Sequence, residues 1–167
     1  MHAVYIDMQK AFDKVPHQEL IHKLKTQFAV RDKVLEWFRS FLSNRRQRVK
    51  IGTAYSDWAS VTSGVPQGSV LAPLLFIIYV RDMQENLNDV KVIKFADDTK
   101  LYCEYIDQNS QQLIQANLER INQWLQKWKM SANTSKTGYL NLREFRMKFH
   151  YTHSVKRKFY TRSKKKI

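Results

Sequence analysis

The sequence predicts one α+β domain in which helices pack on one face of an antiparallel sheet. Segments with strand-like and helix-like patterns are mixed along the chain, without the strict alternation that is typical of a parallel α/β fold. The chain has 167 residues, of which 43% are hydrophobic and 13% aromatic, so it can bury a core and its composition is not that of a disordered protein. No apolar run reaches the ~20 residues needed to span a bilayer, and we expect no membrane partner.

The first half of the chain is expected to form a strand, two helices and a hairpin. Residues 3–6 are apolar and end at Asp7, a pattern that predicts a buried strand. Apolar residues at helical spacing follow Pro16, and residues 32–42 predict a second, amphipathic helix. Polar and apolar residues then alternate on both sides of Gly52, which predicts a pair of short strands.

The middle of the chain is expected to add a helix and a second hairpin. A loop at residues 63–69 contains two glycines and precedes a mostly buried helix that ends near residue 86. Strands are expected at residues 90–95 and 101–106, joined by a tight turn at residues 96–99.

A long helix and a last strand are expected to follow, at residues 109–130 and 139–142. The long helix has an apolar stripe at steps of four and three residues, which predicts that it packs against a core. The stripe comprises Ile114, Leu118, Ile121, Leu125 and Trp128.

The chain is strongly basic, with a net charge of +14 from 29 Lys and Arg and 15 Asp and Glu residues. This balance predicts a polyanionic partner. Residues 143–167 contain ten Lys and Arg and one Glu, so we expect a partial domain at residues 1–142 and a basic tail at residues 143–167. The tail can be a solvated end, a nucleic-acid-binding arm or out-of-frame sequence. The N-terminus lacks a secretory signal pattern, and a single cysteine fits a reducing compartment. The localisation is unknown, and is intracellular, nuclear or cytoplasmic, if the chain is expressed.

Three acidic residues stand next to predicted strands. Asp7 ends the first strand, and Asp97 and Asp98 lie at the turn of the second hairpin. An aspartate pair beside an apolar strand is costly unless a cation neutralises it, and Mg²⁺ prefers oxygen ligands together with substrate phosphates. Two such ions about 4 Å apart can activate a 3′-hydroxyl and stabilise a leaving pyrophosphate. Alternatively, the pair serves only to cap the hairpin turn, where aspartate is common.

Five segments resemble motifs of the reverse transcriptases of non-LTR retrotransposons, in particular the jockey-like and related LINE groups. One such motif is a weak signal, but four of them in the family's order, all but the segment at 40–49, are very specific. The segments are YIDMQKAFDKV at residues 5–15, SFLSNRRQRV at 40–49, GVPQGSVLAPLLF at 64–76, FADDT at 95–99 and NTSKT at 133–137. The chain therefore resembles the palm region of such a reverse transcriptase, with the fingers and thumb missing.

The resemblance implies an RNA-directed DNA polymerase, a nucleotidyltransferase that adds deoxynucleotides to a primer 3′-hydroxyl. It implies two Mg²⁺ ions as cofactors, which Mn²⁺ can replace. The implied partners are an RNA template, a DNA primer and deoxynucleoside triphosphates, and protein partners are unknown. The alternative is a catalytically silent remnant of a mobile element, which would act at most as a basic nucleic-acid-binding module.

The resemblance also implies catalytic roles for individual residues. Asp7 and Asp97 match the principal metal ligands, and Asp98 matches the second member of the hairpin pair, which supports the metal site. Lys136 matches a residue that approaches the triphosphate and protonates the departing pyrophosphate, although a solvated loop lysine explains it equally well on residue type alone. Asp13 is expected to be structural, as a cap of the following helix.

Further residues match the family's substrate contacts. Phe12 falls where the family places a steric gate against the nucleotide 2′-hydroxyl, although a phenylalanine after a strand is more often part of a core. Gln67, together with Pro66 and the backbone of Gly64 and Gly68, matches the segment that contacts the template and the nascent base pair.

Overall fold

The computed structural model describes residues 2–103, 108–141 and 146–148 of the chain. The chain divides into two compact units. The sheet unit contains Met1–Gln9, Met83–Lys127 and Ser131–Ile167, and the helical unit contains Lys10–Asp82 and Trp128–Met130. Within the described ranges, no helix is long and apolar enough to cross a membrane.

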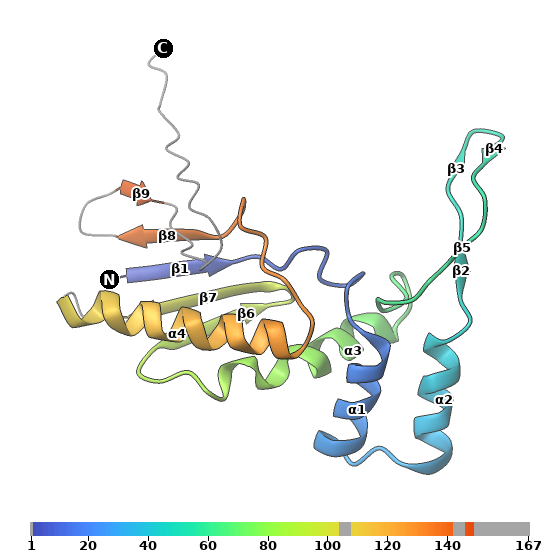
Figure 1. Ribbon diagram of the computed structural model, residues 1–167, viewed down its shortest axis with the longest axis horizontal. Helices are drawn as coiled ribbons and strands as arrows, with labels where there is room; N and C mark the ends of the chain where they lie inside the picture. The colour runs from blue at the N-terminus through green and yellow to red at the C-terminus, as the bar shows by residue number, and fades with distance from the viewer. Residues whose placement is uncertain (1, 104–107, 142–145, 149–167) are drawn as a thin grey trace. The chain divides into compact units, whose positions relative to one another are not determined.

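The sheet unit is built on an antiparallel sheet of five strands in the order β6-β7-β1-β8-β9 (Figure 1). Its central strand, β1, pairs with β7 on one side and with β8 on the other, although both strands are far away in sequence. The strands are β1 His2–Ile6, β6 Lys91–Phe95, β7 Asp98–Cys103, β8 Gly138–Asn141 and β9 Arg146–Lys148. The predicted antiparallel sheet is therefore confirmed, and the first strand lies beside the second hairpin.

Helix α4, Gln108–Lys127, covers one face of this sheet and lies against β1 and β7 (Figure 1). Successive strand residues point to opposite faces, and Val4 and Leu101, which pair directly across β1 and β7, are both buried. The predicted apolar stripe is buried at Ile114, Leu118, Ile121 and Leu125, whereas Trp128, also buried, follows the end of α4 and belongs to the helical unit. Burial of each such side chain contributes about 1.5–3 kcal/mol, which explains why this segment folds as a helix with one fixed face.

The other face of the sheet exposes Tyr5 of β1 and Asp98 and Lys100 of β7. Tyr5 pairs with Lys100, and the lysine ammonium lies 4.8 Å from the centre of the tyrosine ring. Asp98, two residues before Lys100, is exposed on the same face. Polar side chains thus collect on the face opposite α4.

The turn between β6 and β7 is tighter than the sequence pattern predicts. Phe95 pairs directly with Asp98, so Ala96 and Asp97 alone form the turn and Asp98 already belongs to β7. The pattern predicts this strand only from residue 101, because polar residues obscure its start. Ala96 has a φ of 52°, a conformation that glycine adopts more readily than alanine. The predicted end of the strand, at residues 104–106, lies outside the described residues.

The helical unit contains α1 His17–Gln27, α2 Asp32–Leu42 and α3 Leu71–Val80. Both α2 and α3 pack against α1, and Leu24 and Phe76 are fully buried. Helix α3 is shorter than predicted, because the chain continues from it as a 3₁₀ helix, η1 Arg81–Gln84.

A buried lysine connects α1 to the end of α3. Lys23 is 0% exposed, and its ammonium donates to the carbonyl of Tyr79 at 2.6 Å and to Asp82 at 2.5 Å. The same nitrogen lies 3.8 Å from the centre of the Trp128 ring. Burial raises the pKa of Tyr79, so its hydroxyl stays protonated and donates to the carbonyl of Trp128. These contacts offset the cost of removing a cation from water.

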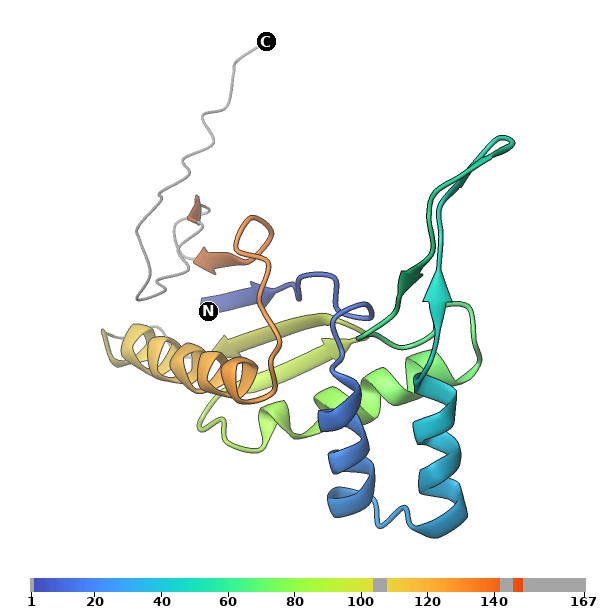
Figure 2. The same cartoon turned by 45° about the vertical axis from the view of Figure 1, so that its right-hand side comes forward.

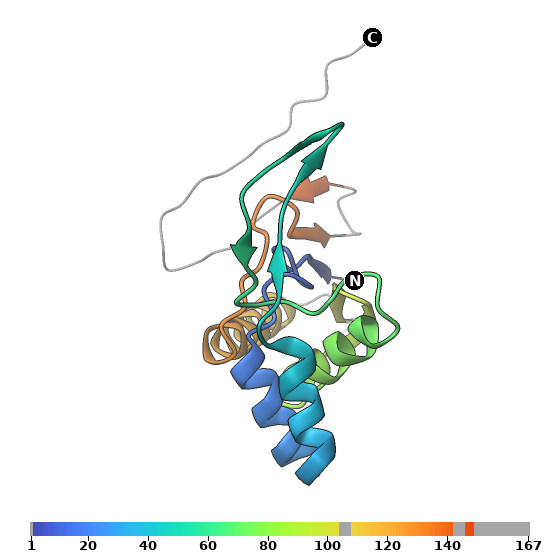
Figure 3. The same ribbon diagram turned by 90° about the vertical axis from the view of Figure 1, so that its right-hand side faces the viewer.

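The predicted hairpin between α2 and the 63–69 loop is confirmed, as a two-stranded arm. Strand β2 Arg46–Gln47 pairs with β5 Ala59–Ser60, and β3 Lys50–Ile51 pairs with β4 Ala54–Tyr55. The amide of Val61 donates to the carbonyl of Arg45 and closes the base of the hairpin. Residues 45–61 are called the arm below, and Figures 2 and 3 show it extending away from the end of α2.

The basic tail is described only at β9, whose backbone pairs with β8. The sequence pattern does not predict this strand, since residues 146–148 have no alternation long enough to recognise. The prediction that residues from 145 onward pack poorly otherwise lies outside the described residues.

Candidate active site

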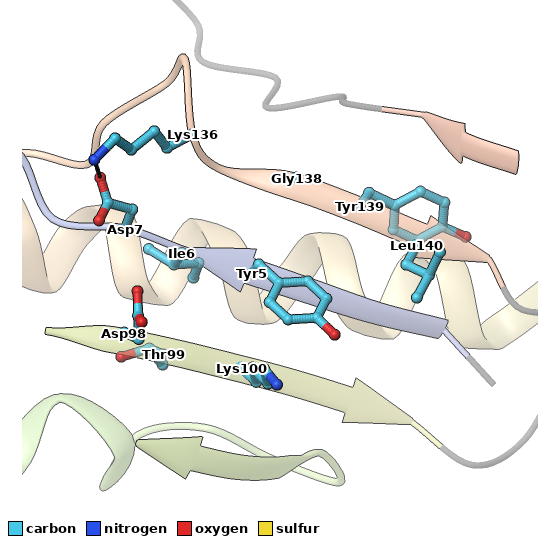
Figure 4. A pocket seen from close by; sticks show the side chains of 10 residues that line it. All are labelled: Tyr5, Ile6, Asp7, Asp98, Thr99, Lys100, Lys136, Gly138, Tyr139 and Leu140. Atoms are coloured by element: carbon cyan, nitrogen blue, oxygen red, sulfur yellow. Dashed lines mark ion pairs between the residues drawn. The ribbon is translucent and has the colours of Figure 1, made fainter. Parts of the chain in front are cut away.

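Two carboxylates of the sheet unit line one groove on the exposed face of the sheet (Figure 4). The groove has a volume of about 560 Å³, and Asp7, Asp98 and Lys136 are among its lining residues. Because Ile6 pairs with Thr99, one further step of the antiparallel register places Asp7 opposite Asp98. In Figure 4 Asp7 lies between Lys136 and Asp98. The strand register therefore joins two carboxylates that are ninety positions apart.

Asp7 is held by backbone contacts with the segment that follows α4. Its carbonyl accepts a hydrogen bond of 2.7 Å from the amide of Asn133, and the next residues continue the contact through a bridge between Met8 and Ala132. The side chain of Asp7 is 19% exposed. Strand β1 thus ends in a fixed position with its carboxylate open to the groove.

Lys136 reaches Asp7 from a compact loop. Its ammonium lies 3.8 Å from Asp7 Oδ2, and its side chain is 70% exposed. Asn133 organises the loop, because its side-chain oxygen accepts from the amide of Ser135 at 3.2 Å and from the Ser135 hydroxyl at 2.7 Å. The carbonyl of Asn133 also accepts from the amides of Lys136 and Thr137. An exposed ion pair of this kind contributes at most about 1 kcal/mol, so the loop, more than the pair, places Lys136.

Asp97 occupies the second position of the β6–β7 turn, and it is not among the residues that line the groove. In the part of the chain that the structure describes, no three His, Cys, Asp or Glu side chains are grouped so that they could hold a metal ion. The role of Asp97 as a principal metal ligand therefore stays a prediction. Two carboxylates on one groove still fit Mg²⁺, which binds one or two of them and completes its shell with water and substrate phosphates.

The residues that match the family's substrate contacts lie in the helical unit, and two of them, Gly64 and Gln67, line a polar cavity of about 550 Å³. Lys10, Asp13, Arg45 and Gln67 are among its lining residues. The amide group of Gln67 donates to Asp13 Oδ1 at 2.6 Å. Helix α1 begins after Pro16 without a side-chain cap, so the expectation that Asp13 caps this helix is wrong. Its carboxylate holds Gln67 instead.

Gly64 approaches the backbone more closely than any other residue type could. A Cβ atom on Gly64 would lie 2.7 Å from the carbonyl oxygen of Asp13, and its φ is +90°. Its carbonyl accepts from the His17 imidazole, and its amide donates to the carbonyl of Val15. Gly68 also has a positive φ, of +86°, but a Cβ atom there would meet nothing within 4 Å. The glycines of this loop are therefore required for different reasons, close approach at Gly64 and backbone conformation at both.

Phe12 and Pro66 have structural contacts as well as predicted substrate contacts. The Phe12 ring stacks on the buried ring of Phe76, with centroids 4.5 Å apart, and Phe12 remains partly exposed. The carbonyl of Pro66 accepts from the amide of Ser69 and closes the loop before α3. Packing on one side and exposure on the other are compatible with both expectations for Phe12, as a core residue and as a gate.

Three residues with clear roles were not singled out by the sequence pattern. Asn133 organises the Lys136 loop, Lys23 is buried among aromatic rings, and Arg45 has a guanidinium nitrogen that is buried without a hydrogen-bond partner in the described residues. A turn-forming asparagine two residues before a serine is a signal that could have identified the first. Lysine and arginine on a helix or hairpin normally indicate a solvated position, so the sequence pattern did not indicate the burial of Lys23 and Arg45.

Comparison with known proteins decides the family. The model of the family described as reverse transcriptase (RNA-dependent DNA polymerase) matches residues 1–159. The chain belongs to this reverse transcriptase family. The match extends beyond residue 137, where the last recognisable motif ends.

The relatives of this reverse transcriptase chain include polymerases of non-LTR mobile elements. It is 33% identical over 143 residues to the probable RNA-directed DNA polymerase from transposon BS of Drosophila melanogaster, a match that covers 81% of the chain and 16% of that protein. It is 30% identical over 145 residues to the RNA-directed DNA polymerase from mobile element jockey of the same organism, covering 79% of the chain and 15% of that protein. The predicted resemblance to jockey-like reverse transcriptases is thus confirmed, for a chain that spans about one sixth of these relatives.

Solved structures of telomerase share the fold. The telomerase of Candida albicans superposes with a TM-score of 0.65 at 18% identity, covering 84% of this chain and 27% of that one. Apo telomerase of Candida tropicalis gives a TM-score of 0.63 at 17% identity, covering 86% of this chain and 29% of that one. At this identity the likeness concerns the fold alone, and it agrees with the predicted reverse-transcriptase palm.

Proposed function

We propose that this chain is the catalytic palm of an RNA-directed DNA polymerase that transfers deoxynucleotides to a primer 3′-hydroxyl on an RNA template. The observation that carries the proposal is the pairing of β1 with β7, which places Asp7 and Asp98 on one exposed groove. A reverse transcriptase fold with two carboxylates at this position suits phosphoryl transfer, because catalysis there depends mainly on positioning and on stabilising charge.

In the proposed site, Asp7, Asp97 and Asp98 would hold two Mg²⁺ ions, which Mn²⁺ can replace. When bound, the ions would lower the pKa of the attacking 3′-hydroxyl and neutralise negative charge on the phosphates. The remaining tasks belong to the protein. Asp7 is fixed by the Asn133 contact, so its carboxylate requires little reorganisation when a substrate enters the groove.

Lys136 is proposed as the residue that approaches the triphosphate and donates a proton to the departing pyrophosphate. Its ammonium is near Asp7 and largely exposed, so it is accessible to a phosphate. A positioned general acid contributes typically about 10²- to 10⁴-fold to a rate. A lysine held by a preformed loop reaches that range more readily than one on a free segment.

The helical unit is proposed to contact the template and the nucleotide. Phe12 would act as the gate against the 2′-hydroxyl, since its stacking on Phe76 keeps the ring rigid. Gln67 would contact the nascent base pair together with the loop that contains Gly64, Pro66 and Gly68. Lys10 and Arg45 add positive charge to the cavity beside this loop, which suits a phosphate-bearing ligand.

A catalytically silent nucleic-acid-binding module is the second candidate, and the net charge of +14 favours it. Both candidates predict binding of nucleic acid, so binding does not separate them. They differ in whether the carboxylates are needed for a reaction.

The deciding experiment places residues 1–142 of this chain in the corresponding segment of the jockey polymerase and measures primer extension on an RNA template with Mg²⁺. We expect extension by the chimera, and a loss of at least about 10³-fold in Asp7→Asn and Asp97→Asn, since metal coordination contributes several kcal/mol. Asp89→Asn is the matched control, because this exposed aspartate has a φ of 54° that asparagine tolerates.

Nucleic-acid binding should persist in all three variants, since the carboxylates do not hold the backbone of the template. Full extension by Asp97→Asn would remove that residue from the metal site. A chimera that binds primer and template but never extends them would support the silent module instead.

A further inference from the structure

The arm carries a row in which cations and aromatic rings alternate. The Arg48 guanidinium lies 4.0 Å from the centre of the Tyr55 ring and 4.6 Å from that of the Trp58 ring. Arg46 lies 5.7 Å from Trp58, and the Lys50 ammonium lies 5.4 Å from Tyr55. All four distances are within the ~6 Å over which cation–π attraction acts. The row runs in the order Arg46, Trp58, Arg48, Tyr55 and Lys50.

A bulge in the hairpin produces this arrangement. Lys50 pairs with Tyr55 near the tip, whereas Arg46 pairs with Ser60 near the base. These two registers differ by one residue, so the second strand carries one residue more than the first between the paired segments. Such a bulge adds local twist and redirects side chains. It allows Trp58 and Tyr55 to flank the same arginine, Arg48.

The two faces of the arm differ. Residues 46, 48 and 50 of the first strand share the face with the rings, and the alternation of a strand directs Val49 and Ile51 to the other face. The row extends over about 13 Å, from the rise of ~3.3 Å per strand residue. The arm contains four Lys and Arg residues and one acidic residue, Asp57, so its net charge is positive.

The arm has no core of its own. All residues from 46 to 60 are exposed, and Tyr55 and Trp58 retain 50% and 51% of their surface. A two-stranded hairpin without a packed face is marginally stable in water, and the cation–π contacts explain part of its order. They use one part of each ring, and the exposed part of each residue is left for another partner.

We propose that the arm is a binding surface for single-stranded nucleic acid, separate from the groove of Asp7 and Asp98. Its cations match a phosphate backbone, and its half-exposed rings match unstacked bases, which is the combination that single-strand-binding surfaces use. Arg46, Arg48 and Lys50 contact phosphates, and Tyr55 and Trp58 stack on bases. The proposal does not depend on polymerase activity, because no residue of the arm belongs to the carboxylate groove.

The first test measures binding of the 167-residue chain to a fluorescein-labelled 20-nucleotide single strand, as RNA and as DNA, by fluorescence anisotropy at several salt concentrations. Arg46→Gln, Arg48→Gln and Lys50→Gln in one variant should reduce the slope of log K against log salt by about 2, at ~0.7 per phosphate contact. The matched control changes Lys25, Arg31 and Lys33, three exposed residues at or beside α1 and α2, to Gln. The control loses the same charge and should keep its slope.

Ring variants separate stacking from charge. Tyr55→Ala with Trp58→Ala should weaken binding at least tenfold without changing the salt slope. Val49→Ala with Ile51→Ala changes two apolar residues on the opposite face and should alter affinity less than twofold. Equal losses in the two pairs, or equal slopes in the two charge variants, would overturn the proposal.

Photocrosslinking of the unaltered chain provides a test that needs no variant to fold. A single strand that contains 5-iodouridine should crosslink to the peptide that contains Tyr55 and Trp58, as identified by mass spectrometry. Crosslinks confined to residues 143–167, or found only with duplex, would show that the arm is not the binding surface.

Discussion

Substitution of Gly64 by alanine should be strongly destabilising, because two costs act at one position. The new Cβ would lie 2.7 Å from the carbonyl oxygen of Asp13 and 2.9 Å from its Cα, and both are backbone atoms that cannot rotate away. Relieving such a clash costs about 1–3 kcal/mol. A φ of +90° adds about 1–2 kcal/mol for a residue with a side chain.

The unfolded state offsets part of this loss. Replacing glycine by alanine restricts the unfolded chain and returns about 0.4–1 kcal/mol. The expected net change in the free energy of unfolding is therefore a loss of about 2–4 kcal/mol. For a chain of this size, each kcal/mol lowers Tm by about 2–4 °C, so we expect a fall on the order of 10 °C.

Gly68→Ala is the matched control, since Gly68 has nearly the same φ, of +86°, and open space around the added Cβ. It should lose only about 1 kcal/mol, or about 2–4 °C. Thermal unfolding followed by circular dichroism, with urea unfolding for the free energies, measures both variants. Equal shifts for Gly64→Ala and Gly68→Ala would refute the close approach as the reason for Gly64.

Two further predictions concern polar groups that the pattern did not single out. Lys23→Met leaves the Asp82 carboxylate without its cation in a buried site, and should lower the free energy of unfolding in urea by about 3–5 kcal/mol. The double variant Lys23→Met with Asp82→Leu should recover much of that loss. A double variant less stable than the single one would contradict the argument. Asn133→Ala removes the acceptor for two hydrogen bonds from Ser135 and should lower the free energy of unfolding by about 1–2 kcal/mol. Thr134→Ala, at the exposed neighbouring position, is the control and should lower it by less than about 0.5 kcal/mol. Equal losses would show that Asn133 does not organise the loop.

Elements with a strong hydrophobic period were predictable from the sequence. The predicted stripe is buried at its four positions within α4, and α2 spans the predicted residues 32–42. Burial of one face decides such elements, and the sequence displays that face directly. The same holds for β1, where an apolar run ends at Asp7.

Pairing and turns were less predictable because they depend on contacts that are distant in sequence. The start of β7 at Asp98 follows from a two-residue turn, which the polar residues around it conceal. Strand β9 forms from residues without a recognisable period. In the candidate site, motif resemblance identified Asp7 and Asp98, but only the β1–β7 register shows that these two share a groove that Asp97 does not line.

One motif, residues 5–15, contributes residues to both compact units, and these residues are positioned in two different ways. Residues 5–15 end β1 with Asp7 in the sheet unit, and then supply Phe12 and Asp13 to the helical unit. Asp7 is placed by strand register, a property of many hydrogen bonds, so one side-chain change nearby should move it little. Asp13 and Gln67 are placed by the close approach of Gly64, a single contact that one methyl group removes. Substitutions that preserve the sheet should therefore leave the carboxylate groove intact, whereas a change at Gly64 should first disrupt the loop proposed to contact template and nucleotide.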